Sequence, residues 1–358
     1  MKVLVGLSGG VDSAVTACVL KQAGHEVIGA TMTIWDEETM RHVPKENAGC
    51  FSPHAAEDIE LAKQLCKQLD IPYHILDCAG LYKQKVLDYF KDEYINGRTP
   101  NPCVLCNEFI KFDALPSAAK QAGIAFDKFA TGHYAQISYN ENSNRWQLCQ
   151  GVDEKKDQTY FIYRLKQEQL EHILMPLGGM TKAQVRTLAE QYNLPVKSKA
   201  DSQDFYTGDL NDIIQAPPKQ GYFVDKSGRV LGTHKGIWHY TVGQRKGLGI
   251  SADKPLYVLS LNATKNEVVL GYAEDCLKSH LTAEKVVWVS IEAPSAPIDC
   301  LVKVRSTQVP TPAKITAIDD KVTVAFQEPQ KAVAKGQSVV FYDGNGYVLG
   351  GGIIEDSF

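Results

Sequence analysis

The first thirteen residues combine an apolar run with a short group of glycine, serine and aspartate. Residues 2–7 read Lys-Val-Leu-Val-Gly-Leu, and Ser8-Gly-Gly-Val-Asp-Ser13 follows directly. A helix is predicted over residues 13–23, so this group would form the turn between a strand and a helix. In such a turn, glycines let backbone N–H groups approach an anion, and the helix dipole favours negative charge. The sequence therefore predicts a phosphate-binding loop.

One residue of this loop, Asp12, carries a negative charge where a phosphate is expected to bind. A Mg²⁺ ion between its carboxylate and a phosphate would remove this conflict, because Mg²⁺ often binds a carboxylate together with substrate phosphates. The alternative is an ordinary polar turn. The loop is not a Walker P-loop, since no G-x-x-x-x-G-K-[ST] pattern occurs near the first strand.

A second reactive group is a C-x-x-C pair, Cys103 and Cys106, preceded by Asn96-Gly-Arg-Thr-Pro-Asn-Pro102. The prolines predict extended backbone before the cysteines, and a helix is predicted over residues 109–122. Thiols placed ahead of a helix N-terminus are favoured as thiolates. The pair is a candidate redox pair, metal site or sulfur carrier, and the alternative is two cysteines that only pack.

Metal binding by this pair would need further ligands. Zinc usually takes four, and Cys50 with His54 could complete a set, although the sequence contains no second C-x-x-C. An iron–sulfur cluster on Cys103, Cys106 and a third ligand is the other metal alternative. The remaining cysteines are interpreted as structural, namely Cys18, Cys66, Cys78, Cys149, Cys276 and Cys300.

The composition is that of a soluble globular protein, with 44% hydrophobic and 22% charged residues. A length of 358 residues predicts two or three domains. Without a signal peptide or a membrane-length apolar run, and with nine irregularly spaced cysteines, a cytoplasmic location and no membrane partner are expected. The net charge of −4 argues against a broadly basic nucleic-acid binder, but local basic groups remain.

The elements that must position these groups change in type along the chain. Up to about residue 205, strands and helices alternate, which is typical of a parallel sheet with crossover helices. The predicted strands are residues 2–7, 26–33, 73–77 and 128–131. The predicted helices are residues 13–23, 53–69, 82–96, 109–122 and a last one that opens with a capping box at Thr181 and runs to about Tyr192.

From about Gly221 the sequence consists of short β-rich runs broken by glycine, proline and aspartate. Such spacing indicates small β domains or barrels. Pro294 and Pro297 are predicted to mark a joint between two of them. The predicted strands are residues 237–241, 257–261, 267–271, 301–304, 322–326 and 338–342.

Several motifs together resemble one known family. Ser8-Gly-Gly-Val-Asp-Ser13 resembles the PP-loop of ATP pyrophosphatases, and the C-x-x-C segment, Phe129-Ala-Thr-Gly-His-Tyr134, Lys156-Asp-Gln158, Gly243-Gln-Arg-Lys-Gly-Leu-Gly249 and Gly350-Gly-Gly-Ile-Ile354 follow in order. This ordered set resembles the tRNA-specific 2-thiouridylases over essentially the whole chain. The resemblance implies an α/β fold with an N-terminal doubly wound parallel sheet (residues 1–205; PP-loop, adenine nucleotide alpha hydrolase-like). It also implies a small central β-rich, tRNA-binding domain (206–284) and a C-terminal β-barrel (285–358).

The resemblance also implies a reaction. Such enzymes use ATP and Mg²⁺ to adenylate the 2-carbonyl oxygen of the wobble uridine in the tRNA anticodon loop. Sulfur from a protein persulfide then displaces AMP, so the products are 2-thiouridine, AMP and pyrophosphate. A single-stranded loop lets the target base leave its stack. The implied partners are tRNA and a sulfur-donor protein, such as a cysteine desulfurase or a sulfur-relay carrier.

The resemblance assigns roles to individual residues. Cys106 matches the catalytic nucleophile, and Asp12 would meet Mg²⁺ through the phosphate. The matched ATP-binding positions are Gly6, Leu7, Ser8, Gly9, Gly10, Val11, Asp12, Ser13, Met32 and Gly132. The matched positions near the target base are Asn101, Pro102 and Cys103, and those contacting the rest of the tRNA are His133, Lys156, Asp157, Gln158, Arg305, Ser306 and Gln337.

Three positions depart from the family pattern. Cys103 stands where many members have Asp, Ser306 stands where an aromatic residue is usual, and Tyr206 stands where the family carries its persulfide-bearing cysteine. Tyrosine cannot carry sulfane sulfur. Either Cys103 takes over this role, or the route of sulfur differs, or catalysis is lost and an RNA-binding protein remains. Another PP-loop adenylating ligase is the alternative enzyme.

Overall fold

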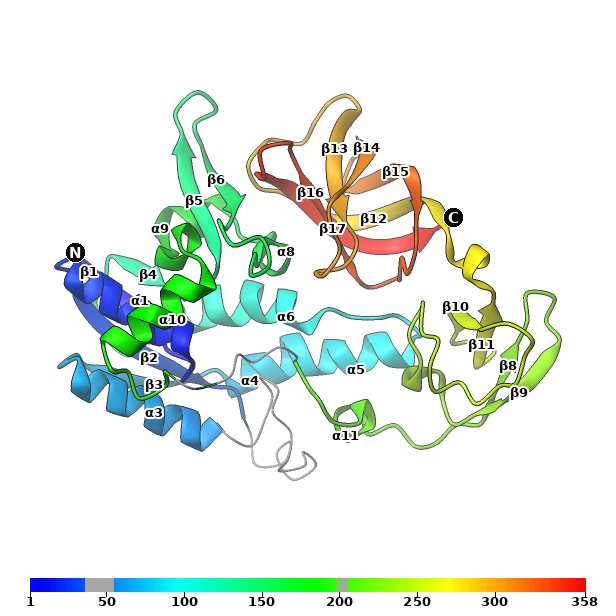
Figure 1. Cartoon of the computed structure of the whole chain (residues 1–358), viewed down its shortest axis with the longest axis horizontal. Coiled ribbons are helices and arrows are strands. Elements are labelled where there is room, and N and C mark those ends of the chain that lie inside the picture. Colours follow the sequence, from blue (N-terminus) through cyan, green and yellow to red (C-terminus); the bar gives the residue numbers. More distant parts are fainter. Residues whose placement is uncertain (36–54, 198, 200–204) are drawn as a thin grey trace.

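The computed structural model describes residues 1–35, 55–197, 199 and 205–358 (Figure 1). Its N-terminal part contains a five-stranded parallel sheet with the strand order β3-β2-β1-β4-β7. These strands are β1 (Lys2–Gly6), β2 (Glu26–Thr33), β3 (Tyr73–Asp77), β4 (Lys128–Ala130) and β7 (Ile173–Leu174). The predicted parallel sheet is thus confirmed.

Alternating side chains of β1 pack into two different cores. Val3 and Val5 belong to a cluster that includes residues of α1 (Val11–Gln22), α3 (Ala55–Gln68) and α10 (Lys182–Gln191). Leu4 points to the opposite face and joins a larger cluster. Because successive strand residues face opposite sides, helices cover both faces of the sheet. The doubly wound arrangement that the sequence predicted is confirmed.

The helix that carries the cysteines begins earlier than predicted. It runs without a break through α6 (Pro102–Leu105), a π-helical stretch (Cys106–Ala114) and α7 (Leu115–Gln121). Asn101 is the N-cap, and its side chain accepts a hydrogen bond from the Val104 N–H (3.3 Å). The predicted start near Phe109 is wrong, because Asn-Pro acts here as an N-cap followed by proline at the first helical position.

The other predicted helices form with small shifts. The predicted helix over residues 82–96 consists of α4 (Ala79–Tyr82), a π-helical stretch (Lys83–Leu87) and α5 (Asp88–Ile95). Helix α10 opens with the predicted capping box between Thr181 and Gln184. A hairpin and short helices complete this part, namely β5 (Ala135–Asn140), β6 (Arg145–Gln150), α8 (Thr159–Ile162), α9 (Gln167–His172) and α11 (Leu210–Ile214).

A small sheet with the order β10-β11-β8-β9 follows. It is formed by β8 (Gly221–Val224), β9 (Val230–His234), β10 (Tyr257–Asn262) and β11 (Glu267–Gly271). The predicted strand over residues 237–241 is wrong, because Ile237–His239 form a 3₁₀ turn. Ile237 and Trp238 are both buried there, so their apolar character reflects core packing and not a strand.

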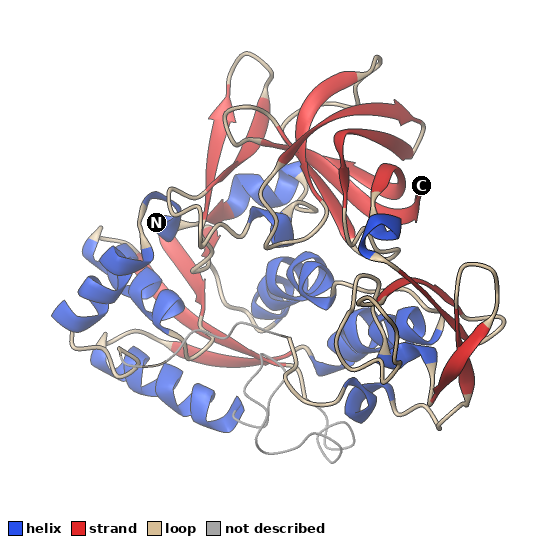
Figure 2. Ribbon diagram, turned by 45° about the vertical axis from the view of Figure 1, so that its right-hand side comes forward, coloured by secondary structure: helices blue, strands red, loops and turns tan. Residues whose placement is uncertain are grey.

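The C-terminal part is a closed barrel with the order β12-β15-β14-β13-β16-β17 (Figure 2). Its strands are β12 (Lys278–Trp288), β13 (Ile298–Lys303), β14 (Thr311–Ile318), β15 (Lys321–Gln330), β16 (Ser338–Tyr342) and β17 (Val348–Ser357). Pro294 and Pro297 lie between β12 and β13, so the joint predicted there lies within one barrel. The division of the chain at residues 205 and 284 stays a prediction, and β12 already begins at Lys278. No helix of the described part of the chain is long and apolar enough to cross a membrane.

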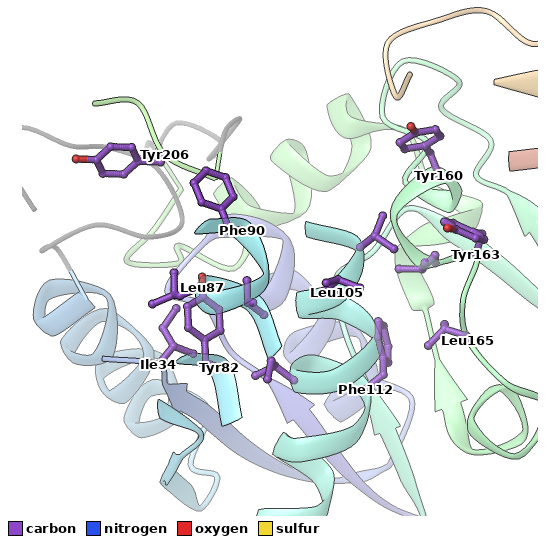
Figure 3. Packing of buried hydrophobic residues seen from close by; sticks show 14 of the residues in the cluster. Ile34, Tyr82, Leu87, Phe90, Leu105, Phe112, Tyr160, Tyr163, Leu165 and Tyr206 are labelled. Atoms are coloured by element: carbon purple, nitrogen blue, oxygen red, sulfur yellow. The ribbon is translucent and has the colours of Figure 1, made fainter. Parts of the chain in front are cut away.

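The barrel packs closely on the N-terminal part through tyrosines near α8. The Tyr160 hydroxyl donates to the Ser338 carbonyl (2.8 Å), and the Tyr163 hydroxyl donates to the Gly352 carbonyl (3.2 Å). Both rings are buried, and Figure 3 shows them beside each other. A Cβ atom on Gly351 would lie 2.6 Å from the Tyr163 ring and 2.6 Å from the Val339 carbonyl oxygen. The C-terminal glycine motif therefore allows β17 to approach Tyr163.

Replacing Gly351 by alanine should destabilise the protein by about 1–3 kcal/mol, because the new methyl group cannot be accommodated without moving backbone. The matched control is Gly344→Ala, since a Cβ atom at Gly344 meets nothing within 4 Å. The measurement is the free energy of unfolding in urea for both variants. Equal stability of the two would contradict the packing role of Gly351.

Candidate active site

The glycine- and serine-rich loop lies between β1 and α1. Gly9 has a φ of +68°, and a Cβ atom there would lie 2.6 Å from the Asp58 carbonyl oxygen, so glycine is required at this position. The Ser13 hydroxyl accepts from the Ser8 N–H (3.2 Å) and donates to the Gly10 carbonyl (3.1 Å). The two serine hydroxyl oxygens are 3.3 Å apart. The loop is therefore held in place by its own side chains at the N-terminus of α1.

A cavity of about 320 Å³ opens over this loop at the carboxyl ends of the parallel strands, where ligands bind in open α/β sheets. It brings together the loop, both cysteines of the C-x-x-C pair and the end of β4. The predicted site residues that line it are Gly6, Leu7, Ser8, Gly10, Val11, Asp12, Ser13, Met32, Cys103, Cys106, Gly132, His133 and Gln158.

The two cysteines share the cavity because they lie three residues apart in one helix. Residues at positions i and i+3 of a helix occupy the same face, and here Cys103 is in the first turn. Negative charge on sulfur is favoured at such a helix start. Cys78 lies near Cys106, and its pKa is raised to about 11, mainly by burial and then by the neighbouring Asp77 and Cys106. Burial likewise raises the pKa of Cys18 to about 11 and of Cys66 to about 12, which makes these thiols poor nucleophiles.

Asp12 is held by two partners from distant parts of the chain. The Lys182 ammonium donates to both carboxylate oxygens (2.7 and 2.9 Å), and the Tyr134 hydroxyl donates to Oδ1 (2.8 Å). A second carboxylate of the cavity wall, Asp58, forms an ion pair with Lys199. Mg²⁺ commonly uses one or two carboxylates together with phosphate oxygens. Asp12 therefore fits as the carboxylate ligand of Mg²⁺ once a phosphate is present and Lys182 moves away from it.

No group of three or more histidine, cysteine, aspartate or glutamate side chains in the described part of the chain is arranged to hold a metal ion. Cys50 and His54, which the zinc alternative needs, lie outside the described residues. The zinc and iron–sulfur alternatives for Cys103 and Cys106 therefore stay predictions.

Tyr206 is turned into the protein core instead of the cavity. Its hydroxyl donates to Asp212 Oδ2 (2.5 Å), and burial, followed by this hydrogen bond, raises the pKa of the phenol. Figure 3 shows its ring near Phe90. The preceding residue, Phe205, lines the cavity and packs against Phe90 with 5.1 Å between ring centres. The position that carries a cysteine in the family pattern is thus a structural anchor here.

His133 is buried at the cavity wall next to Gly132. Its Nδ1 lies 2.8 Å from the Thr131 hydroxyl oxygen, and its ring packs against Phe112 with 5.3 Å between ring centres. Burial, and to a smaller degree the positive charge of Lys111, lowers the pKa of His133 to about 3. The imidazole is therefore neutral at physiological pH.

Most residues predicted to contact tRNA make internal contacts in this structure. Asp157 accepts hydrogen bonds from the Gly151 and Thr159 N–H groups (3.4 and 3.3 Å). The Gln158 side chain accepts from the Tyr134 N–H (3.0 Å), while Lys156 is half-buried in the same turn. This turn is therefore ordered by its own polar side chains, and its role toward tRNA stays a prediction.

The predicted tRNA contacts of the barrel lie away from the cavity wall. The Arg305 guanidinium donates to the Ala332 carbonyl (3.3 Å) and to the Val242 carbonyl (3.5 Å), and burial lowers its pKa. Ser306 is half-buried beside it. Gln337 is buried and donates to the carbonyls of Thr99 (3.1 Å) and Pro100 (3.0 Å). Three predicted site residues of the N-terminal part, namely Gly9, Asn101 and Pro102, likewise do not line the cavity.

Sequence reasoning missed several residues of the cavity wall. Thr31 on β2 and Thr131 directly after β4 could have been found from the rule that strand ends form the site of a parallel sheet. The other missed residues belong to no recognisable sequence motif, because only the folded chain brings them next to the loop. The missed residues include Thr31, Trp35, Asp58, Lys111, Thr131, Lys199 and Phe205.

Comparison with known protein families gives consistent matches along the chain. A family model described as "tRNA methyl transferase HUP domain" matches residues 1–206. The models "tRNA methyl transferase PRC-barrel domain" and "Aminomethyltransferase beta-barrel domain" match residues 210–272 and 278–354.

Curated relatives match over nearly the whole chain. The tRNA-specific 2-thiouridylase MnmA of Endomicrobium trichonymphae is 50% identical, with 99% of each chain covered. Its counterpart in Acetivibrio thermocellus is 47% identical, again with 99% of each chain covered. Among solved structures, a 4-thiouridine synthetase in complex with RNA and ATP is 16% identical with a TM-score of 0.38, and the match covers 60% of this chain and 46% of that chain.

Acidification should cost this protein stability through His133. Its pKa is lower in the folded state than in the unfolded chain, so the unfolded state takes up a proton below about pH 6.5 and the folded state does not until about pH 3. Between pH 7 and pH 5 this difference should lower the free energy of unfolding by about 2 kcal/mol. A His133→Gln variant should lack this contribution. Urea unfolding at both pH values measures it, and identical pH dependence of the two proteins would contradict the assignment.

Proposed function

This chain belongs to the family of tRNA-specific 2-thiouridylases, and we propose that it is an ATP-dependent sulfurtransferase that converts a uridine of tRNA to 2-thiouridine. The observation that carries the proposal is the shared cavity. One space is lined both by the phosphate-binding loop and by Cys103 and Cys106. An ATP-dependent amide-forming ligase would need the loop but has no use for the cysteine pair.

The loop supports the adenylation step. Backbone N–H groups at the start of α1 and the Ser8 and Ser13 hydroxyls would bind the phosphates, because the loop's own hydrogen bonds already hold these groups at the helix N-terminus. Met32 and Gly132 line the same cavity and would contact the adenine and ribose. ATP supplies an adenylate to the uridine 2-oxygen, which turns a poor leaving group into a good one. Asp12 would hold Mg²⁺ through the phosphates, and the ion would neutralise charge on them.

Sulfur transfer then needs two sulfur atoms of the protein. In our proposal a persulfide on Cys106 attacks C2 of the adenylated uridine through its terminal sulfur, and AMP leaves with the former carbonyl oxygen. The Cys103 thiolate next attacks the Cys106 sulfur and breaks the S–S bond. The transferred sulfur stays on the uridine, and a Cys103–Cys106 disulfide forms. A cellular thiol must reduce this disulfide before the next turnover.

The position of Tyr206 supports this role of Cys103. Tyr206 is bonded to Asp212 and does not line the cavity, so the segment that supplies a cysteine in the family pattern supplies no thiol here. Cys103 lies on the same helix face as Cys106 and replaces an aspartate that many members carry. We propose that the sulfur donor is a cysteine desulfurase or a sulfur-relay protein, and that the substrate base is the wobble uridine of an anticodon loop. Arg305, Ser306 and Gln337 of the barrel would contact the same tRNA.

The loop can be tested by removing single groups. Asp12→Ala and Ser13→Ala should each lower the rate of AMP and pyrophosphate formation with undermodified tRNA by about a hundredfold or more, because preorganised charge stabilisation is lost. The affinity for tRNA should change little. Ser117→Ala is the control, because the Ser117 hydroxyl donates a hydrogen bond to Asp113 and Ser117 does not line the cavity. Normal AMP formation by both loop variants would contradict the proposal.

The cysteine pair makes a separate prediction. Cys106→Ser should abolish 2-thiouridine formation, and Cys103→Ser should lower it by about a hundredfold, since a nearby thiol is lost. Both variants should still release pyrophosphate in the adenylation step, which precedes sulfur transfer and shows that the protein is folded. Cys276→Ser, outside the cavity, is the matched control. Mass spectrometry of tRNA nucleosides measures the product, and iron and zinc are determined in anaerobically purified protein. Full activity of Cys103→Ser would reject its role in sulfur transfer, and bound iron that depends on Cys103 would favour a cluster.

A further inference from the structure

We propose that Lys199 binds the pyrophosphate portion of ATP. Before the nucleotide binds, the Lys199 ammonium is paired with the Asp58 carboxylate. This inference rests on the proposed function and adds a residue to it. The Lys199 side chain lines the cavity, and its ammonium donates to the Gly9 carbonyl of the phosphate-binding loop (3.2 Å). It also forms an ion pair with Asp58.

The loop needs a cation from elsewhere in the chain. Residues 8–13 contain no lysine or arginine, whereas a Walker P-loop carries a lysine that reaches the phosphates. The cavity wall also holds two carboxylates, Asp12 and Asp58, which oppose a polyphosphate. Lysines that line the described part of the wall are Lys111 and Lys199. Lys111 lies near His133. Lys182 is paired with the Asp12 carboxylate, whereas Lys199 donates to the loop backbone.

The surroundings of Lys199 fix its backbone and leave its side chain able to turn. Arg186 of α10 donates to the Lys199 carbonyl (2.7 Å), which ties the backbone of this residue to α10. The side chains of Lys199 and Asp58 remain 32% and 33% exposed. The ammonium can therefore move from Asp58 to a phosphate without disturbing buried contacts.

The position of Asp58 makes the exchange specific. Its backbone lies against Gly9, so its carboxylate is fixed relative to the loop. A phosphate in the loop and the Asp58 carboxylate would compete for the same ammonium. Removing the ammonium should therefore weaken pyrophosphate binding, and removing the Asp58 charge should strengthen it. If the ion pair only stabilised the fold, removing either charge would weaken pyrophosphate binding.

The test compares pyrophosphate and AMP binding by isothermal titration calorimetry in the full-length protein with Mg²⁺. Lys199→Met should weaken pyrophosphate binding about tenfold, since a charge-assisted contact is lost, and should leave AMP binding unchanged. Asp58→Asn should strengthen pyrophosphate binding severalfold, and Lys199→Arg should retain most of the affinity. Lys197→Met is the matched control, because Lys197 is two residues away and bonds Asn193 instead (2.7 Å).

Each outcome bears on the proposal. Equal pyrophosphate affinity of Lys199→Met and the unmodified protein would overturn the role of Lys199 and leave the proposed function intact. Equal losses for pyrophosphate and AMP, or a loss in Asp58→Asn, would show that the ion pair only stabilises the fold. An unmodified protein that binds neither ATP nor pyrophosphate would overturn the proposed function together with this inference.

Discussion

The start of the helix at Pro102 determines the geometry of the whole site. Its first turn carries Cys103, and Cys106 follows on the same face, so a shift of one residue would rotate both sulfurs away from the cavity. Several weak interactions fix this start: the Asn101 cap, the proline at the first helical position and the Gln337 side chain, which holds the two carbonyls just before it. Because Gln337 belongs to the barrel, the C-terminal part of the chain helps to position Cys103 and Cys106, which belong to the N-terminal part.

Charge in the cavity is balanced by pairs of residues that come from distant parts of the chain. Asp12 is paired with Lys182, and Asp58 is paired with Lys199. Each carboxylate is thereby neutralised in the absence of a ligand, so the site does not repel an approaching polyphosphate as two free carboxylates would. The net charge of −4 therefore says little about the field that a nucleotide meets.

The sequence predicts the parallel sheet well because its strands obey a simple rule. Residues 26–33 and 73–77 are short runs rich in β-branched and aromatic residues, and both strands form at these limits. Prediction failed where one signal allows two structures. Asn101-Pro102 suits either extended backbone or a helix start, and the apolar residues near Trp238 suit either a strand or a buried turn. The loop and the cysteines of the site were found from local motifs, whereas the pairs that Lys182 and Lys199 form could not be, since their partners are 170 and 141 residues away.

One apolar cluster runs through all parts of the molecule. It contains Leu4 of the parallel sheet, Val258 of the small sheet and Val340 of the barrel, together with residues of the cysteine helix. Units that share a core cannot be exchanged independently, because each presents apolar surface shaped by the others. In evolutionary terms, recombination that replaced only the barrel would leave this shared surface mismatched. The three parts are therefore expected to be inherited together. The cysteine helix lies at their junction, so replacing the barrel alone would disturb this helix first.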